Sequence, residues 1–237
     1  MDLKHIKAIL FDKDGTLLKY DETWGPVNRR AALAAAGGDQ DLANLFLVAT
    51  GYDPETRTVQ VGSTLGAGNS EEIACAWHRL GAICSKAELI ELLDQQFSEA
   101  MREAVPVRNI EGVTKAFHAS GYTLGVASSD SEQAISVFLA SQGVSSFYTF
   151  VAGYNSGYGH KPEPGMFIAF CEQHGLIPSQ VAMVGDNPQD IEMARRSNAG
   201  LCIAVLSGNG TAADLGPLAD ITLNDVSELP ALFGLRP

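Results

Sequence analysis

One short stretch, Ile6–Leu18, constrains the fold of this chain more than any other. It begins with an apolar run that ends at Phe11, and a run of this length is typical of a strand buried on both faces of a parallel sheet. Asp12 and Asp14 follow directly, and a Gly-Thr pair then turns the chain. Carboxylates are costly beside a hydrophobic core, and open α/β sheets bind ligands beyond the carboxyl ends of their strands. The stretch therefore predicts a functional site, although an acidic β-turn is the simpler interpretation.

The second half of the chain alternates strands with helices from Asn109 onward. Helical patterns separate short apolar segments, and this alternation predicts an α/β protein with a doubly wound parallel sheet. The segments expected to be strands are Tyr122–Ala127, Tyr148–Ala152, Val181–Val184, Leu201–Leu206 and Asp220–Leu223.

Between about Tyr20 and Val107 the spacing of apolar residues is helical instead, with capping signals at Asn69 and Ser85. This region interrupts the sheet after its first strand. We therefore expect a core of residues 1–17 and 109–237 and a helical domain of residues 18–108. The glycine-rich segment Gly51–Gly68 is either an ordinary connection or a loop that touches substrate. The expected helices are Trp24–Ala36, Asp41–Ala49, one from Asn69 through Leu80 and one from Ser85 to about Ala104.

Composition narrows the classes of partner. Hydrophobic residues make up 46% of the 237 residues, which is enough for a sizeable core. The net charge of −12 repels phosphate backbones, so nucleic acid is not expected as a partner. The four cysteines form no C-x-x-C pair, and no apolar run reaches the length of a membrane span. We expect a cytoplasmic protein without a membrane partner.

Polar residues follow the other predicted strands in a fixed order. Ser128 and Ser129 end the second core strand, Lys161 opens a helix after the third, and Asp186 and Asp190 follow the fourth. Together with the pentad D-K-D-G-T, this order resembles the four motifs of the haloacid dehalogenase-like hydrolase superfamily. The helical insertion, the K-P-x-P form at 161–164 and the G-D-x-x-x-D form at 185–190 are similar to its phosphoglycolate phosphatase and β-phosphoglucomutase branch. The resemblance implies a Rossmann-like core with an inserted all-α cap domain.

The expected chemistry starts from the substrate. A phosphate monoester is a dianion that hydrolyses very slowly unaided, so carboxylates need Mg²⁺ to offset the charge. The resemblance implies that Asp12 is both a metal ligand and the nucleophile that forms an aspartyl-phosphate. It implies that Asp14 binds the metal through its backbone carbonyl and acts as general acid and base through its carboxyl group. It makes Asp186 a further metal ligand and Asp190 its support.

The phosphate itself is expected to bind at Ser128, at Ser129 and at Lys161, through a hydroxyl, backbone N–H groups and a cation respectively. Each residue also has a simpler interpretation: Ser128 as a strand-end hydroxyl, Lys161 as a surface lysine, and the two late acids as helix caps. We assign no role to His160. The loop 153–159 carries Asn155 and Ser156 where relatives often carry acids, so metal support from this loop is not expected.

The prediction is a Mg²⁺-dependent phosphatase that hydrolyses the phosphoric monoester of a small phosphorylated metabolite, as a monomer or homodimer. A phosphomutase of the β-phosphoglucomutase type remains open, because the sequence does not separate transfer to water from transfer to a sugar. A dehalogenase needs no acid at position 14. A phosphonate hydrolase is expected to use a cap lysine, and no lysine lies between Lys19 and Lys86. A non-enzymatic phospho-acceptor does not need Asp14.

Overall fold

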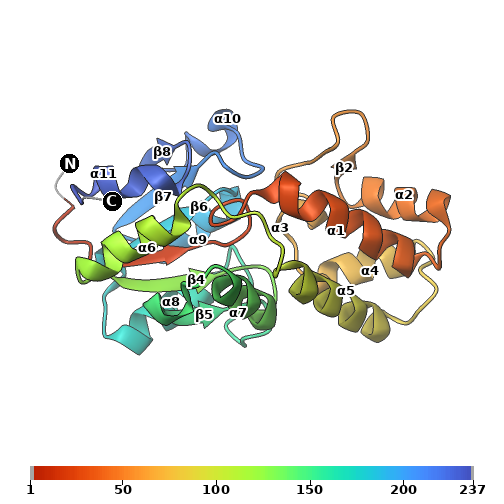
Figure 1. Cartoon of the computed structure of the whole chain (residues 1–237), viewed down its shortest axis with the longest axis horizontal. Coiled ribbons are helices and arrows are strands. Elements are labelled where there is room, and N and C mark those ends of the chain that lie inside the picture. Colours follow the sequence, from red (N-terminus) through yellow and green to blue (C-terminus); the bar gives the residue numbers. More distant parts are fainter. Residues whose placement is uncertain (1–2, 236–237) are drawn as a thin grey trace.

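The computed structural model describes residues 3–235; residues 1, 2, 236 and 237 of the predicted core lie outside this range. Its main feature is a six-stranded sheet in the order β5-β4-β1-β6-β7-β8 in which every neighbouring pair is parallel (Figure 1). β1 therefore lies at the centre between β4 and β6, which confirms the predicted fold class. The strands are β1 (Ala8–Phe11), β4 (Thr123–Ala127), β5 (Tyr148–Ala152), β6 (Val181–Gly185), β7 (Leu201–Val205) and β8 (Ile221–Leu223).

Helices cover both faces of this sheet because successive strand residues point to opposite faces. Ile9 and Phe11 of β1 pack into one apolar layer, and Ala8 and Leu10 pack into the other. The first layer is closed by α6 (Ile110–Ala119), α7 (Glu132–Ser141) and α11 (Leu229–Leu232). The second layer is closed by α8 (Gly165–His174), α9 (Pro188–Arg196) and α10 (Ala212–Leu215).

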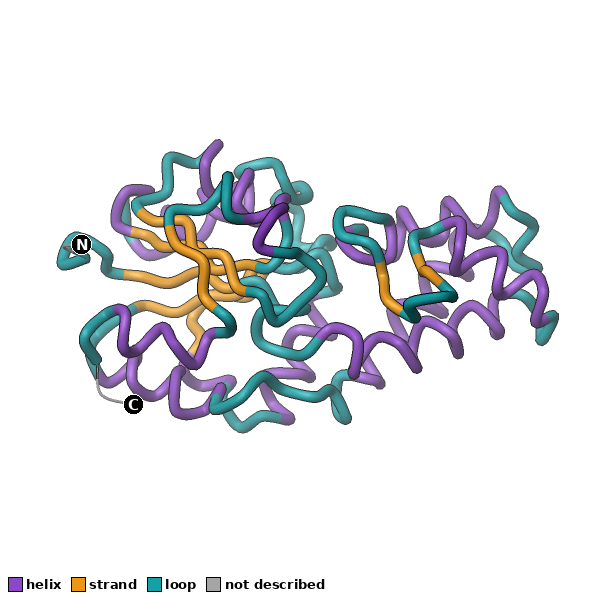
Figure 2. The backbone as a smooth tube through the Cα atoms, turned by 90° about the horizontal axis from the view of Figure 1, so that it is seen from above, coloured by secondary structure: helices purple, strands orange, loops and turns teal. Residues whose placement is uncertain are grey.

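The remaining helices lie together beyond one end of the sheet (Figures 1 and 2). We call residues 18–108 the helical part. Two capping boxes, at Asn69 and Ser85, start α4 and α5 where the sequence predicts them. The helical part contains α1 (Tyr20–Ala35), α2 (Gln40–Ala49), α3 (Thr64–Ala67), α4 (Ser70–Arg79) and α5 (Lys86–Ala100).

The helical part also contains a small hairpin of β2 (Tyr52–Asp53) and β3 (Thr58–Val59), visible in Figure 2. We expected no strand here, and strands of two residues are too short to show a sequence period. No helix within residues 3–235 is long and apolar enough to cross a membrane.

The chain passes between the sheet and the helical part twice, and the two passages are hydrogen-bonded to each other. Lys19 N donates to Val105 O (2.9 Å), and Val107 N donates to Leu17 O (3.0 Å). Leu18 and Pro106 form an antiparallel bridge between these bonds. The two connections therefore run as one paired ribbon.

Candidate active site

The candidate site lies where the three central strands end. Phe11 is in register with Val126 of β4 and with Val184 of β6, so the residues that follow these strands meet at one edge of the sheet. Asp12 and Asp14 follow β1, Ser128 and Ser129 follow β4, and Asp186 follows β6. Lys161 reaches the same place from the segment between β5 and α8.

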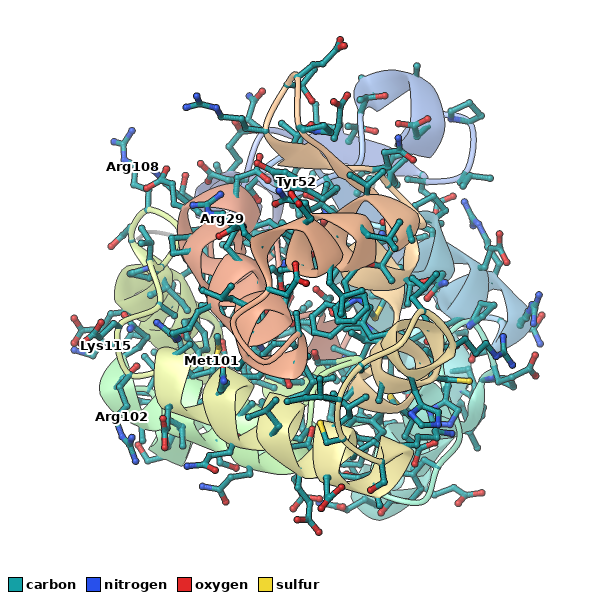
Figure 3. The ribbon with its side chains drawn as sticks, turned by 90° about the vertical axis from the view of Figure 1, so that its right-hand side faces the viewer. Arg29, Tyr52, Met101, Arg102, Arg108 and Lys115 are labelled. Atoms are coloured by element: carbon teal, nitrogen blue, oxygen red, sulfur yellow. The ribbon has the colours of Figure 1, made fainter. Side chains whose placement is uncertain are left out.

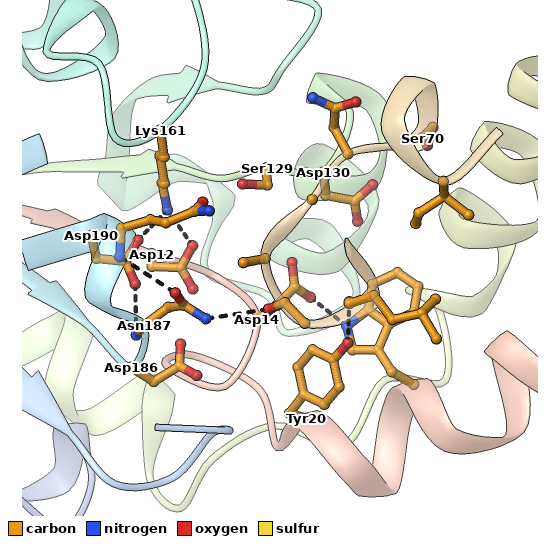
Figure 4. A pocket seen from close by; sticks show the side chains of 18 of the residues that line it. Asp12, Asp14, Tyr20, Ser70, Ser129, Asp130, Lys161, Asp186, Asn187 and Asp190 are labelled. Carbon is orange, nitrogen blue, oxygen red and sulfur yellow. Dashed lines mark hydrogen bonds and ion pairs between the residues drawn. The ribbon is translucent and has the colours of Figure 1, made fainter. Parts of the chain in front are cut away.

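Lys161 joins the predicted nucleophile to a second carboxylate. Its Nζ donates to Asp12 Oδ1 at 2.5 Å and to Asp190 Oδ1 at 2.6 Å, and all three side chains are buried (Figure 4). Burial raises the pKa of Asp12 to about 7; the Lys161 ammonium opposes this rise, and Asp190 and Asp14 add to it. Burial alone would lower the pKa of Lys161, but Asp12 and Asp190 outweigh it and the pKa is raised. Lys161 is therefore a buried, protonated cation at the site and not a surface lysine.

The residues here fit a divalent cation. Oxygen atoms of Asp12, Asp186 and Asp190 lie within 4.8 Å of one another, and all three residues are buried. Burial, followed by the charges of Asp12 and Asp190, raises the pKa of Asp186 well above its usual range. Asp186 accepts from Thr16 Oγ1 (3.3 Å) and Asn209 N (3.0 Å), both of which are neutral donors. Three buried carboxylates with one ammonium carry excess negative charge, which a hard cation such as Mg²⁺ would neutralise.

Two glycines make room for Asp186. Gly15 has φ = +81°, and a Cβ there would clash with the Asp186 carboxylate. A Cβ at Gly208 would clash with the same carboxylate. The glycine of the D-K-D-G-T pentad is thus required by backbone conformation and by the approach of Asp186.

Asp14 belongs to a second cluster that includes residues the sequence analysis missed. Asp14 Oδ1 accepts from Lys13 Nζ (2.5 Å) and from Trp24 Nε1 (2.7 Å). Lys13 Nζ also lies 3.0 Å from Asp130 Oδ2 and 5.2 Å from the centre of the Trp24 ring, and its side chain is fully buried. Burial raises the pKa of Asp130 to about 6 against the opposing charge of Lys13. Trp24 comes from α1, so the helical part directly holds the predicted acid-base residue.

The two serines differ in their surroundings. Ser128 is buried, accepts from Asp130 N (3.1 Å) and donates to Asp14 Oδ2 (3.3 Å). Its hydroxyl therefore points to Asp14, the predicted acid-base residue, and Ser128 is not among the residues that line the pocket. Ser129 does line the pocket. The structure thus brings all seven predicted site residues together, while their roles remain predictions.

A pocket with about 600 Å³ of empty space, part of which is open to solvent, lies between this edge of the sheet and the helical part (Figure 4). Leu65–Gly68 line it, which favours the interpretation of the 51–68 segment as a loop near the substrate over a plain connection. Asn187 Nδ2 donates to Gly66 O (3.4 Å) across the gap. The residues that line the pocket are Asp12, Asp14, Tyr20, Trp24, Asn28, Leu65–Ser70, Ile73, Phe97, Ser129, Asp130, Lys161, Asp186, Asn187, Gln189 and Asp190.

His160 and the loop 153–159, to which the sequence assigned no role, both make defined contacts. His160 Nδ1 lies 3.5 Å from Asn69 Nδ2 and its ring stacks near Tyr154, so it contacts the helical part beside the pocket. Asn155 Oδ1 accepts from Glu132 N (3.0 Å), and Ser156 Oγ donates to Glu132 Oε2 (2.8 Å). The loop 153–159 therefore supports the start of α7.

With this geometry in place, comparison with known proteins identifies the class. The sequence model of the haloacid dehalogenase-like hydrolases matches residues 6–198, and the chain belongs to this family. The predicted superfamily is confirmed.

Several individual proteins are similar to this chain over nearly their whole length. A phosphoglycolate phosphatase from Chromobacterium violaceum is 28% identical over 97% of each chain. One from Salmonella typhimurium is 27% identical over 97% of this chain and 94% of its own. Among solved structures, a predicted phosphoglycolate phosphatase from Haemophilus somnus superposes with a TM-score of 0.70 at 19% identity, covering 98% and 99% of the two chains. CbbY from Rhodobacter sphaeroides in complex with phosphate gives 0.69 at 21% identity, covering 94% and 96%.

Proposed function

We propose that this protein is a Mg²⁺-dependent phosphatase that hydrolyses a small phosphate monoester through an aspartyl-phosphate on Asp12. The observation that carries the proposal is the buried group of Asp12, Lys161, Asp186 and Asp190 at the carboxyl end of the central strands. The relatives named as phosphoglycolate phosphatases support a phosphate ester as the substrate.

Asp12, Asp186 and the backbone carbonyl of Asp14 would hold Mg²⁺, with Asp190 in support. The bound ion would offset the negative charge of the phosphate and of the carboxylates. Lys161 is bonded to Asp12 and would bind a phosphoryl oxygen, so it holds the substrate next to the nucleophile. An Asp12 oxygen then attacks phosphorus and the bond to the alcohol oxygen breaks.

Asp14 would move the protons. It gives a proton to the leaving alcohol oxygen and then takes one from the water that attacks the aspartyl-phosphate, which releases phosphate and restores Asp12. The donors on Asp14, from Lys13, Trp24 and Ser128, hold its carboxyl group in one position. Ser129 lines the pocket and would contribute to the phosphate cradle.

We further propose that residues 18–108 act as a cap domain on a core of residues 1–17 and 109–237. Trp24 and Leu65–Gly68 reach the pocket from this part, and a closed cap would exclude bulk water from the aspartyl-phosphate. A monomer or homodimer and a cytoplasmic location stay predictions.

A screen of phosphate esters with Mg²⁺, scored by phosphate release, tests the function. We expect release that stops when a chelator removes the metal and returns when Mg²⁺ is added. Interconversion of sugar phosphates without release would instead indicate the phosphomutase. No turnover of any ester, with Mg²⁺ present, would contradict both enzymes.

A further inference from the structure

The pocket has two walls of different chemical character. The wall formed by residues at the edge of the sheet carries five carboxylates and one ammonium group, from Asp12, Asp14, Asp130, Asp186, Asp190 and Lys161. The wall from the helical part has no acidic or basic side chain among the residues that line it. Its apolar members include Leu65, Ile73 and Phe97, which suit the carbon atoms of a ligand.

Two buried polar groups in the uncharged wall have no hydrogen-bond partner of good geometry among residues 3–235. These are Asn28 Nδ2 on α1 and Ser70 Oγ at the start of α4, and the two residues are 4% and 2% exposed. Each group lies near a tyrosine hydroxyl, Asn28 near Tyr20 and Ser70 near Tyr154. These hydroxyls donate to Leu65 O and Asp94 Oδ2, and each can accept a weak contact from its neighbour. Buried polar groups without a well-formed hydrogen bond are rare in native proteins, so a ligand hydroxyl in the pocket can compete with the tyrosine for each of these two groups.

The basic residues of the helical part do not supply the missing charge. Arg29 follows Asn28 in the chain, but it is exposed and lies on the outer surface of α1 (Figure 3). A carboxylate on the leaving group would therefore be buried opposite five carboxylates with no cation on its own side, which is costly.

We propose that this wall binds an uncharged, hydroxyl-bearing alcohol, so that the substrate is the phosphate ester of a polyol or sugar and not of a hydroxy acid. Asn28 Nδ2 donates to one hydroxyl oxygen, and Ser70 exchanges a hydrogen bond with another. This inference rests on the proposed phosphatase function. It separates the chain from what the name phosphoglycolate phosphatase states for its relatives, because glycolate carries a carboxylate.

Glycerol 3-phosphate and 3-phosphoglycerate test it, since they differ only in a CH₂OH group in place of a carboxylate. We expect kcat/KM with Mg²⁺ to be at least about tenfold higher for glycerol 3-phosphate. Hydrolysis of p-nitrophenyl phosphate reports on the phosphatase function separately. If p-nitrophenyl phosphate is hydrolysed and 3-phosphoglycerate is used equally well or better, the inference is overturned while the phosphatase function stands. If neither p-nitrophenyl phosphate nor glycerol 3-phosphate is hydrolysed, the phosphatase function itself fails.

A charge-adding variant gives a sharper test. Asn28→Lys should shift the preference toward 3-phosphoglycerate by about tenfold or more, because it places a cation on the uncharged wall. Asn44→Lys makes the same change at an exposed position of α2 and should leave the preference unchanged. Equal shifts in both variants would contradict the assignment.

Ser70→Ala keeps the test open if Asn28→Lys does not fold. It should lower kcat/KM for glycerol 3-phosphate by about three- to tenfold through the loss of one hydrogen bond. The value for 3-phosphoglycerate should change less, so the preference should fall. An equal loss for both substrates would contradict a contact with the hydroxyl-bearing end.

Discussion

Two buried lysines at the site each bridge a pair of aspartates, yet the two clusters differ in what they leave uncompensated. Lys161 lies between Asp12 and Asp190, with Asp186 as a third carboxylate nearby. Lys13 lies between Asp14 and Asp130 and is closed in by the Trp24 ring and the Met101 sulfur. The first cluster has three carboxylates against one cation and suits a divalent metal. The second has two against one and suits a carboxyl group held in place.

The largest expected difference is between Asp12→Asn and Asp14→Asn. Asp12→Asn removes the proposed nucleophile and should lower turnover of every ester by about 10⁴-fold or more. Asp14→Asn removes only the proton transfer, so it should cost about 10²–10⁴-fold for alkyl phosphates and much less for p-nitrophenyl phosphate, whose leaving group needs no proton. Steady-state phosphate release measures both.

Asp41→Asn, at an exposed position of α2, is the matched control and should not change the rate. An Asp14→Asn enzyme that hydrolyses an alkyl phosphate at the wild-type rate would show that another residue carries the acid-base role.

The next comparison replaces each of the two lysines, in separate variants, with methionine. Lys13→Met should lower the free energy of unfolding by about 3–5 kcal/mol, because it leaves the buried Asp130 carboxylate and the partly buried Asp14 carboxylate without their cation. Lys161→Met removes a cation that competes with the metal. At one Mg²⁺ concentration, Mg²⁺ should therefore stabilise Lys161→Met by about 1–2 kcal/mol more than it stabilises wild type or Lys13→Met. Urea unfolding with chelator and with Mg²⁺ measures the free energy of unfolding of each variant in both conditions. If Mg²⁺ stabilised both variants equally, the distinction between the two clusters would be wrong.

The metal cluster should also respond to pH. The pKa of Asp12 is raised to about 7, so below this pH a proton occupies a proposed metal ligand. Mg²⁺ binding must displace that proton, and affinity should rise by about tenfold or more from about pH 6 to about pH 8. Titration calorimetry with the free enzyme measures this rise. A constant affinity over the range would exclude Asp12 from the metal site or place its pKa outside it.

The smallest effect concerns the contact between the helical part and Asp14. Trp24→Phe keeps an aromatic ring beside Phe97 and Lys13 but removes the N–H donated to Asp14. We expect kcat for alkyl phosphates to fall by about three- to tenfold, with a changed pH profile. Trp77→Phe is the matched control, since Trp77 donates to Phe46 O and Thr50 within the helical part. It should affect stability without changing the pH profile, and the same profile change in both would contradict the role of Trp24.

The first cluster was predictable from the sequence and the second was not. Asp12, Asp186 and Asp190 follow strands whose periodicity and order can be recognised along the chain. Lys13, Trp24 and Asp130 meet through packing between distant segments, and no local pattern marks a lysine that turns away from solvent. Strand-end placement of Asp130, directly after the predicted Ser128 and Ser129, is the one signal that pointed to it.

The bounds of some helices and strands also differ from what the local sequence pattern predicts. α9 begins at Pro188, because Asn187 caps the helix and proline is well suited to its first position. α1 begins at Tyr20 although Pro26 lies inside it. Helix α5 ends at Ala100, short of the predicted Ala104. The hairpin β2–β3 was missed altogether.

The paired ribbon formed by Leu17–Lys19 and Val105–Val107 limits how the two halves of the molecule can be displaced. Two separate linkers would allow independent rotation about each one, whereas two segments tied by backbone hydrogen bonds share a single axis of bending. Trp24, on the segment that leaves this ribbon, and Met101, on the segment that returns to it, contact Asp14 and Lys13 respectively. A rotation about that axis would break both contacts in one movement, while the bonds from Lys13 and Ser128 to Asp14 would stay in place.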